Sequence, residues 1–251
     1  MIQAATFTRR SLLVLGALAA AGCRAGGDGP ASYPGIPAPH PGRARSFTRL
    51  PGHTNNLVWT VDDGADLESL TAYVALCESS DIALTFCATA KFAENWISLA
   101  GRLKALITAG KAQVVNHCYD HISLRPLKAQ QVADQIRWNE DWIQSTFQVT
   151  SRPYLRPPLG HYDGRIGEIA GGLGFTRVVL WTDSLNDSAP VRPSILRERI
   201  SKMTRPGSII LGHANAPSIV ECFDTVRTVI AQQQLKPLTL DAALGTSRAE
   251  G

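Results

Sequence analysis

Two adjacent carboxylates are the first side chains in this sequence that could do chemistry. Asp62 and Asp63 follow a short apolar run and precede Gly64, in the segment TVDDG at residues 60–64. One carboxylate of such a pair can hold a cation while the other takes a proton. Asp-Gly is also an ordinary turn, so the pair alone leaves both interpretations open.

A pair of histidines gives the second signal. His117 and His121 lie in the segment NHCYDH at residues 116–121, directly after another apolar run. Side chains at i and i+4 share one side of a helical turn, so two imidazoles at this spacing can reach one metal. The alternative is a capped turn with two exposed histidines. With Asp63, the pair makes the two-histidine, one-carboxylate set typical of an open catalytic zinc site.

Three later segments also place polar residues after apolar runs. The turn YLRPPLG at 154–160 holds Arg156, which can grip a carboxylate in a two-pronged way beside two rigid prolines. The segment WTDSLND at 181–187 offers Asp183 and Asp187, and LGH at 211–213 ends in His213, a candidate general acid. Taken singly, the turn at 154–160 is equally typical of a plain Pro-rich loop. His213 alone is equally typical of a packed or capping histidine.

The elements that must position these residues are predicted by an alternation of apolar patterns. Short apolar runs favour strands at 57–61, 82–87, 112–116, 176–181, 208–212 and 237–240. Longer amphipathic stretches favour helices at 66–79, 93–108, 127–147, 165–172, 193–203 and 218–234. This alternation predicts an α/β fold with a buried parallel sheet covered by helices, either closed into a barrel or open. Sites of such folds form at the carboxyl ends of the strands, and the segments at 60–64, 116–121, 181–187 and 211–213 lie at the ends of predicted strands.

The first residues read as an export signal. Arg9 and Arg10 precede an apolar stretch from Leu12 to Ala21, which predicts a signal peptide over residues 1–22. The pair resembles a twin-arginine signal, with an ordinary secretory signal as the alternative. The segment AAGC at 20–23 resembles a bacterial lipobox, which predicts lipid on Cys23 and attachment to the outer face of the cell membrane. The alternative is cleavage without lipid and release as a secreted protein.

Composition limits the remaining possibilities. The chain has 251 residues, of which 44% are hydrophobic and 18% charged, which excludes a disordered chain. Five Cys are too few for a disulfide scaffold, and the net charge of +4 gives no reason to expect nucleic-acid binding. Residues 23–51 are rich in Pro and Gly and are predicted to form a tether, followed by one domain over 52–246 that we expect to be monomeric.

Taken in order, the five segments resemble those of the NodB-like polysaccharide deacetylases, carbohydrate esterase family 4. That family carries TFDDG, a histidine pair, RxPxG, DxxDW and LxH in this order, and the resemblance covers roughly residues 55–244. It implies a distorted (β/α) barrel. It also implies that Asp63, His117 and His121 bind a divalent metal, usually Zn²⁺ and sometimes Co²⁺ or another ion. Cys118 replaces the usual Ser or Thr and is an alternative sulfur ligand.

The resemblance also implies catalytic roles. Asp62 would be the general base, oriented by Arg156, and His213 the general acid that protonates the leaving amine. An acid of the fourth segment would stabilise this charged network. The DxxDW spacing is not kept there: either Asn186 replaces the second acid, or Asp187 supplies it after a one-residue slip, and the following Trp is absent.

Several residues are candidates for contacting substrate. By the resemblance, the backbone N–H of Leu159 would help to hold the oxyanion and Leu211 would line the acetyl pocket. Trp181 and Tyr162 are further candidates. Trp138 and Trp142 are spaced i, i+4, which favours core packing or a pair on the helix surface over sugar stacking. Cys77, Cys87 and Cys222 have no motif spacing and are predicted to be buried free thiols.

These observations lead to one functional prediction with two alternatives. We expect a metal-dependent hydrolase that removes acetyl groups from an N-acetylated or O-acetylated polysaccharide of the cell envelope or the environment. The first alternative is a catalytically weak, glycan-binding envelope lipoprotein on the same fold. The second is a hydrolase of a non-sugar C–N bond.

Overall fold

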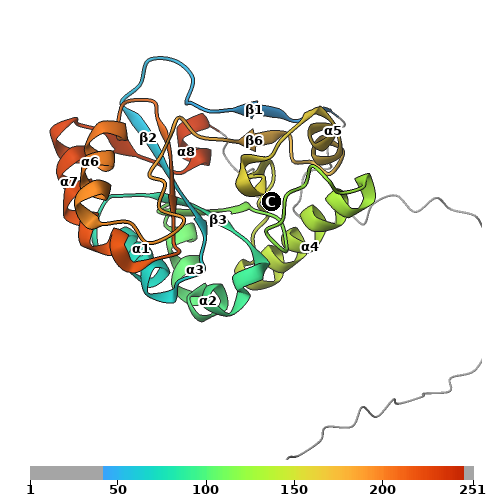
Figure 1. Cartoon of the computed structure of the whole chain (residues 1–251), viewed down its shortest axis with the longest axis horizontal. Coiled ribbons are helices and arrows are strands. Elements are labelled where there is room, and N and C mark those ends of the chain that lie inside the picture. The colour runs from blue at the N-terminus through green and yellow to red at the C-terminus, as the bar shows by residue number, and fades with distance from the viewer. Residues whose placement is uncertain (1–41, 246–251) are drawn as a thin grey trace, which may run out of the picture. The chain divides into compact units, whose positions relative to one another are not determined.

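A computed structural model describes residues 42–245 of the chain (Figure 1). The predicted export signal at 1–22, Cys23 and most of the predicted tether lie outside these residues. Within the described part of the chain, no helix is both long enough and apolar enough to cross a membrane.

Parallel strands form the centre of the fold. They are β1 (Arg45–Phe47), β2 (Asn56–Asp63), β3 (Leu84–Ala88), β4 (Ala112–Asn116), β5 (Tyr154–Leu155), β6 (Arg177–Val179), β7 (Asp183–Ser184), β8 (Ile209–His213) and β9 (Lys236–Pro237). The strand order is β1-β6-β5-β4-β3-β2-β8-β7, with β9 paired to β2. Every named pair is parallel, as the apolar runs predict.

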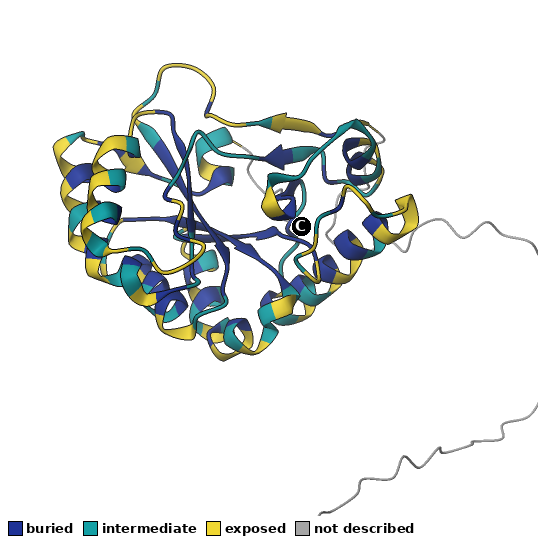
Figure 2. Ribbon diagram, viewed as in Figure 1, coloured by how far each residue is buried: buried dark blue, intermediate teal, exposed yellow. Residues whose placement is uncertain are grey.

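Helices cover the outside of this sheet (Figure 1). They are α1 (Leu67–Ser79), α2 (Ala93–Ser98), α3 (Ala100–Thr108), α4 (Ala129–Phe147), α5 (Gly164–Gly172), α6 (Pro193–Met203), α7 (Phe223–Gln232) and α8 (Leu240–Leu244). Figure 2 shows the central strands buried and the edge strand β1 largely exposed, while the helices present one buried and one exposed face. This is the burial expected of amphipathic helices on a parallel sheet.

Strands near the two ends of the strand order are consecutive in the sequence. Residues 180–182 connect β6 directly to β7, yet β6 pairs with β5 and β1, whereas β7 pairs with β8. The Thr182 N–H also donates to the carbonyl of Ile209. The sheet therefore curls into a parallel half-barrel with helices outside it, which confirms the predicted barrel and excludes the flat open sheet.

Strand β2 shows how the curled sheet divides its side chains. Leu57, Trp59 and Val61 pack with the helices in the largest apolar cluster. Val58 packs instead with Ile209 in a cluster inside the sheet. Because side chains alternate along a strand, Asp62 belongs to the same inner set as Val58 and ends it at the carboxyl edge.

Several predicted elements differ from the structure; among them, the first part of the predicted helix at 218–234 is a 3-10 helix (Pro217–Cys222) before α7. The predicted tether at 23–51 overlaps the sheet, because Arg45–Phe47 form β1 and Ala44 and Leu50 are buried. The predicted helix at 93–108 is divided at Leu99 into α2 and α3. The predicted strand at 237–240 ends at Pro237, because Thr239 caps α8 by accepting from the Ala242 N–H.

Candidate active site

Strand register brings the five polar segments to one edge of the sheet. Asp62 is the direct partner of His213 across β2 and β8. Asn116, at the end of β4, pairs with Ala88 of β3 and Leu155 of β5. Because all these pairs are parallel, their carboxyl ends lie together. A separate cavity of about 720 Å³ lies at the amino end of β2 and contains none of the predicted site residues.

A tight turn presents Asp63 at the end of β2. Asp63 has φ 73° and Gly64 has φ 87°, both in the left-handed region. A Cβ on Gly64 would lie 2.6 Å from the Trp96 ring. The Trp96 Nε1–H in turn donates to the Asp63 carbonyl at 2.9 Å. Only glycine fits this turn, which explains why the two acids are followed by Gly64.

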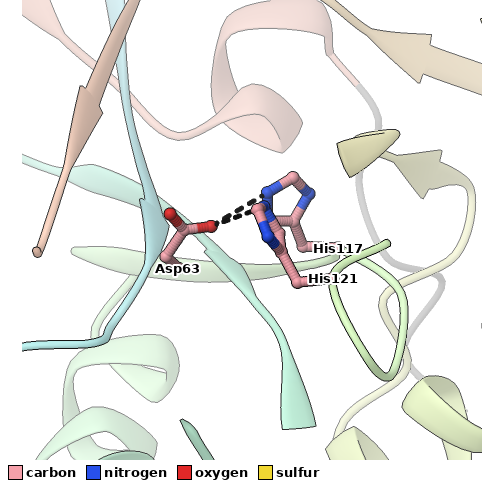
Figure 3. A group of neighbouring side chains, drawn as sticks. All are labelled: Asp63, His117 and His121. Atoms are coloured by element: carbon pink, nitrogen blue, oxygen red, sulfur yellow. Dashed lines mark ion pairs between the residues drawn. The ribbon is translucent and has the colours of Figure 1, made fainter. Parts of the chain in front are cut away.

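Three potential ligand atoms converge in front of this turn (Figure 3). Asp63 Oδ1 lies 2.9 Å from His121 Nε2 and 3.3 Å from His117 Nε2. Figure 3 shows Asp63 coming from β2 and both histidines from the loop after β4. The structure therefore brings together the three residues that the sequence predicts as metal ligands.

The hydrogen bonds around this cluster suit a divalent cation. His117 Nδ1 lies 2.7 Å from the carbonyl of Arg156, which can only accept, so Nδ1 carries a hydrogen and Nε2 is the ring nitrogen that faces Asp63. Asp63 Oδ1 is buried and has no hydrogen-bond partner. A divalent cation between this oxygen and the two ring nitrogens would give each of them a partner. The donor set, two imidazoles and one carboxylate, is one that zinc accepts.

Asn215 supports the cluster and was not predicted from the sequence. Its Nδ2–H donates to Asp63 Oδ2 at 2.7 Å, and its Oδ1 accepts from the Ala65 N–H at 3.4 Å. This bond leaves Oδ1 of Asp63 facing the two histidines. The signal in the sequence is only an amide two residues after His213, which is a common loop residue.

Replacing Asn215 with Ala is therefore expected to weaken zinc binding by about 10–100-fold, because the carboxylate loses the partner that orients it. Competition with a chromophoric chelator measures the affinity without reference to activity. Asn95→Ala is the matched control, since Asn95 donates to the Gly64 and Ala65 carbonyls of the same turn but not to the carboxylate. Equal losses in the two variants would refute the orienting role.

Asp62 and Arg156 form a buried ion pair beside the cluster. Arg156 Nη1 lies 2.9 Å and 2.8 Å from the two Asp62 oxygens. Nη2 donates to Thr60 Oγ1 at 3.0 Å and Nε to the Val179 carbonyl at 2.6 Å, so the guanidinium is held from several directions. Burial would lower the pKa of Arg156, but Asp62 outweighs it, and Arg156 stays charged. Asp62 Oδ2 also lies 3.5 Å from His117 Nε2.

His213 is paired with only one of the two candidate acids. Its Nδ1 lies 2.8 Å from Asp187 Oδ1, and its backbone N–H donates to Asp187 Oδ2 at 3.2 Å. Asp183 lies on β7 as the partner of Ile210. The geometry therefore favours the one-residue slip, with Asp187 supplying the acid. Asn186, with φ 50°, makes the left-handed bend that precedes Asp187.

Replacing Asp187 with Asn is expected to move the basic limb of the kcat profile to lower pH. Burial alone would lower the pKa of His213, but the Asp187 hydrogen bond and the charges of Asp62, Asp187 and Asp63 raise it above its usual value. A general acid must be protonated, so activity is lost as the pH rises through this pKa, and removing the Asp187 charge lowers it. Asp183→Asn tests the other acid and is expected to leave the limb in place. A shift in Asp183→Asn alone would assign the role to that residue.

The residues predicted to contact substrate occupy different positions around the ligand cluster. Leu211 is buried on β8, two residues before His213. The Trp181 ring lies 5.4 Å from the Arg156 guanidinium and against Gly160. Leu159 is exposed in the turn after β5. The hydroxyl of Tyr162 donates to the Ala44 carbonyl at 3.0 Å and is not part of the ligand cluster.

The cysteines lie inside the protein. Cys118 is fully buried and packs with Leu124, Val132 and Ile136, and burial raises the pKa of its thiol well above the usual value. Cys118 packs among apolar side chains and is not part of the ligand cluster, which excludes the alternative of a sulfur ligand. Cys77, Cys87 and Cys222 are buried and unpaired, as the sequence predicts.

Left-handed backbone is concentrated at this edge. In the described part of the chain, seven non-glycine residues have positive φ, and five of them belong to the polar segments: Asp63, Cys118, His121, Leu159 and Asn186. Such conformations cost about 1–3 kcal/mol each and cluster at functional sites. The strain therefore marks the same edge as the charged side chains.

A curled parallel barrel with ionisable side chains gathered at its carboxyl edge is a framework on which hydrolases are built. The family model for polysaccharide deacetylases matches residues 50–178, and the chain belongs to this family.

Two curated proteins illustrate the range of its relatives. The chain is 25% identical over 169 residues to the chitooligosaccharide deacetylase of Azorhizobium caulinodans, covering 67% of this chain and 78% of that protein. It is also 25% identical over 124 residues to the uncharacterized protein YlxY of Bacillus subtilis. That match covers 49% of this chain and spans only 38% of the relative's length.

Solved structures share the fold at low identity. A chitin deacetylase from the fungal pathogen Colletotrichum lindemuthianum is 17% identical, with a TM-score of 0.72 over 82% of this chain and 94% of that one. A carbohydrate esterase family 4 pseudoenzyme from Bacillus anthracis is 22% identical, with a TM-score of 0.71 over 80% of this chain and 69% of that one. The fold thus occurs in a deacetylase and in a pseudoenzyme.

Proposed function

We propose that this protein is a metal-dependent deacetylase that hydrolyses acetyl groups on N-acetylated or O-acetylated glycans. The observation that carries the proposal is the pairing of Asp62 with Arg156 and of His213 with Asp187 on adjacent strands, beside the three converging ligand atoms. Membership in the polysaccharide deacetylase family supports the class of substrate.

Asp63, His117 and His121 would hold the metal, and Zn²⁺ is the ion that fits two imidazoles and one carboxylate best. When bound, such a cation supplies a nucleophile at neutral pH by lowering the pKa of water, and polarises the acetyl carbonyl. The choice among Zn²⁺, Co²⁺ and other divalent ions is open to measurement of the metal content.

The chain's own residues divide the proton transfers. Asp62, held in place by its ion pair with Arg156, would take the proton of the attacking water. The Nδ1–H of His213 donates to Asp187, so its Nε2 is the atom left to protonate the leaving amine or alkoxide. Since Asp62 and His213 are partners across β2 and β8, base and acid border the same space. Leu211 and the backbone N–H of Leu159 would contact the acetyl group.

The site of action is also part of the proposal. The arginine pair and apolar stretch of residues 1–22 support export, by the twin-arginine route, and the AAGC segment supports lipid attachment at Cys23. A protein attached to the outer face of the membrane would reach the acetylated glycans of the envelope.

Acetate release from zinc-loaded protein tests the proposal. We expect acetate from an N-acetylglucosamine pentamer or from peptidoglycan, loss of release after chelation, and recovery when zinc is added. His121→Ala, which removes one ligand, is the matched negative control. No acetate from any acetylated glycan by protein that contains zinc would overturn the proposal.

A second candidate is glycan binding without turnover. Two observations support this candidate: a pseudoenzyme has the same fold, and no Trp follows Asp187. Binding of the pentamer without acetate release, by zinc-loaded wild-type protein, would select this function.

A further inference from the structure

Some of the exposed apolar side chains lie in the loops that carry the ligand cluster. In the described part of the chain, the large exposed hydrophobic residues are Leu67, Ile97, Tyr119, Ile122, Trp138 and Leu159. Tyr119 and Ile122 lie in or next to the loop that carries both histidine ligands, and Leu159 lies in the turn after Arg156. Water-exposed apolar surface at a catalytic edge indicates contact with a ligand.

Two of these residues form an aromatic pair. The rings of Tyr119 and Trp138 lie 5.9 Å apart at 78°, an edge-to-face contact, yet Tyr119 is 37% and Trp138 51% exposed. The next aromatic residue on α4, Trp142, packs against Phe147 at 5.8 Å and joins the core. The predicted helix packing therefore holds for Trp142, whereas Trp138 keeps half of its surface in water.

The backbone that carries the pair is fixed to the ends of the strands. The Tyr119 N–H donates to the Gln135 carbonyl at 3.1 Å, and Thr89 Oγ1 donates to the Tyr119 carbonyl at 3.0 Å. Asn139, the residue after Trp138, donates to the Ala88 carbonyl at 2.9 Å. Trp138 therefore lies at the same carboxyl edge as the ligand cluster, and the loop between His117 and His121 connects the two.

The half-exposed ring of Trp138, which Tyr119 contacts edge-to-face, suits a sugar ring. The C–H faces of a pyranose are apolar and pack against aromatic rings, while its hydroxyls remain in water. We propose that Tyr119 and Trp138 form a stacking platform for a sugar unit of the glycan chain, beside the unit that is deacetylated. This inference rests on the proposed function for the class of ligand, N-acetylhexosamine polymers.

Direct binding tests the platform apart from catalysis. The probe is an N-acetylglucosamine pentamer, titrated into zinc-loaded Asp62→Asn protein, with binding followed by calorimetry. We expect Trp138→Ala in this background to weaken binding by about tenfold, and Trp138→Phe, which keeps a flat apolar face, to weaken it less. Ile97→Ala removes an equally exposed apolar side chain from α2 and is the matched control. Thermal unfolding checks that each variant is folded.

The outcomes separate the platform from the proposed function. Unchanged pentamer affinity in Trp138→Ala, or no binding of the pentamer at all, overturns the platform. If wild-type protein releases acetate, the proposed function stands in either case. If the pentamer binds through Trp138 and no acetate is released, the platform stands and the deacetylase proposal fails. In an active enzyme, the ratio of kcat/KM for pentamer over dimer is expected to fall about tenfold in Trp138→Ala.

Discussion

Asp62→Asn is expected to lower kcat for acetate release by about 10²–10⁴-fold while zinc content stays near that of the wild type. The amide can still accept a hydrogen bond from Arg156 Nη1, which lies 2.8 Å from Asp62 Oδ2, but it cannot take a proton. The three ligand residues are untouched. Steady-state kinetics and metal analysis on the same preparation measure both quantities.

The ligand variant His121→Ala is the comparison that makes this result specific. It is expected to lose activity together with zinc, whereas Asp62→Asn loses activity alone. Turnover close to that of the wild type in Asp62→Asn would remove Asp62 as the general base. Loss of zinc in parallel with activity would instead assign it to metal binding.

Arg156→Met is expected to lower the free energy of unfolding by about 3–5 kcal/mol, because it leaves the Asp62 carboxylate buried without its counter-ion. Arg156 is fully buried and is also held by Thr60 Oγ1 and the Val179 carbonyl, so the variant loses these bonds as well. Urea denaturation, with the midpoint and slope both fitted, measures the change.

An exposed ion pair serves as the control for this loss. Arg102 donates to both oxygens of Glu78 at 2.8 Å and 2.7 Å, but both side chains are more than a third exposed, so Arg102→Met is expected to cost about 1 kcal/mol or less. Replacing both buried partners, in Asp62→Leu/Arg156→Met, is expected to recover part of the stability. A loss in Arg156→Met no larger than in Arg102→Met would show that the buried pair does not stabilise the fold.

The central strands and the ligand set could be predicted because their signals are local. Continuous apolar runs predict β2 and β4 closely, and the spacing of His117 and His121 predicts two ligands in one loop. The curling of the sheet could not be predicted from periodicity. It depends on residues 180–182, which link β6, near one end of the strand order, to β7 at the other end. That information is present only in the pairing.

The elements that were missed have weak local signals. β1, with the sequence RSF, is a three-residue edge strand with no apolar run, and its Pro- and Gly-rich surroundings indicate a tether. Asn215 is a common loop residue whose role arises only when β8 lies beside β2. The exposure of Trp138 depends on which turn of α4 faces the core, and two tryptophans one turn apart do not reveal this.

Arg156 contacts both halves of the site. Its carbonyl fixes the ring of His117, and its guanidinium holds Asp62. A change that moves Arg156 is therefore expected to displace the His117 ring and the Asp62 carboxylate together. Under the proposed function, a variant of Arg156 should therefore be measured both for its affinity for added Zn²⁺ and for acetate release.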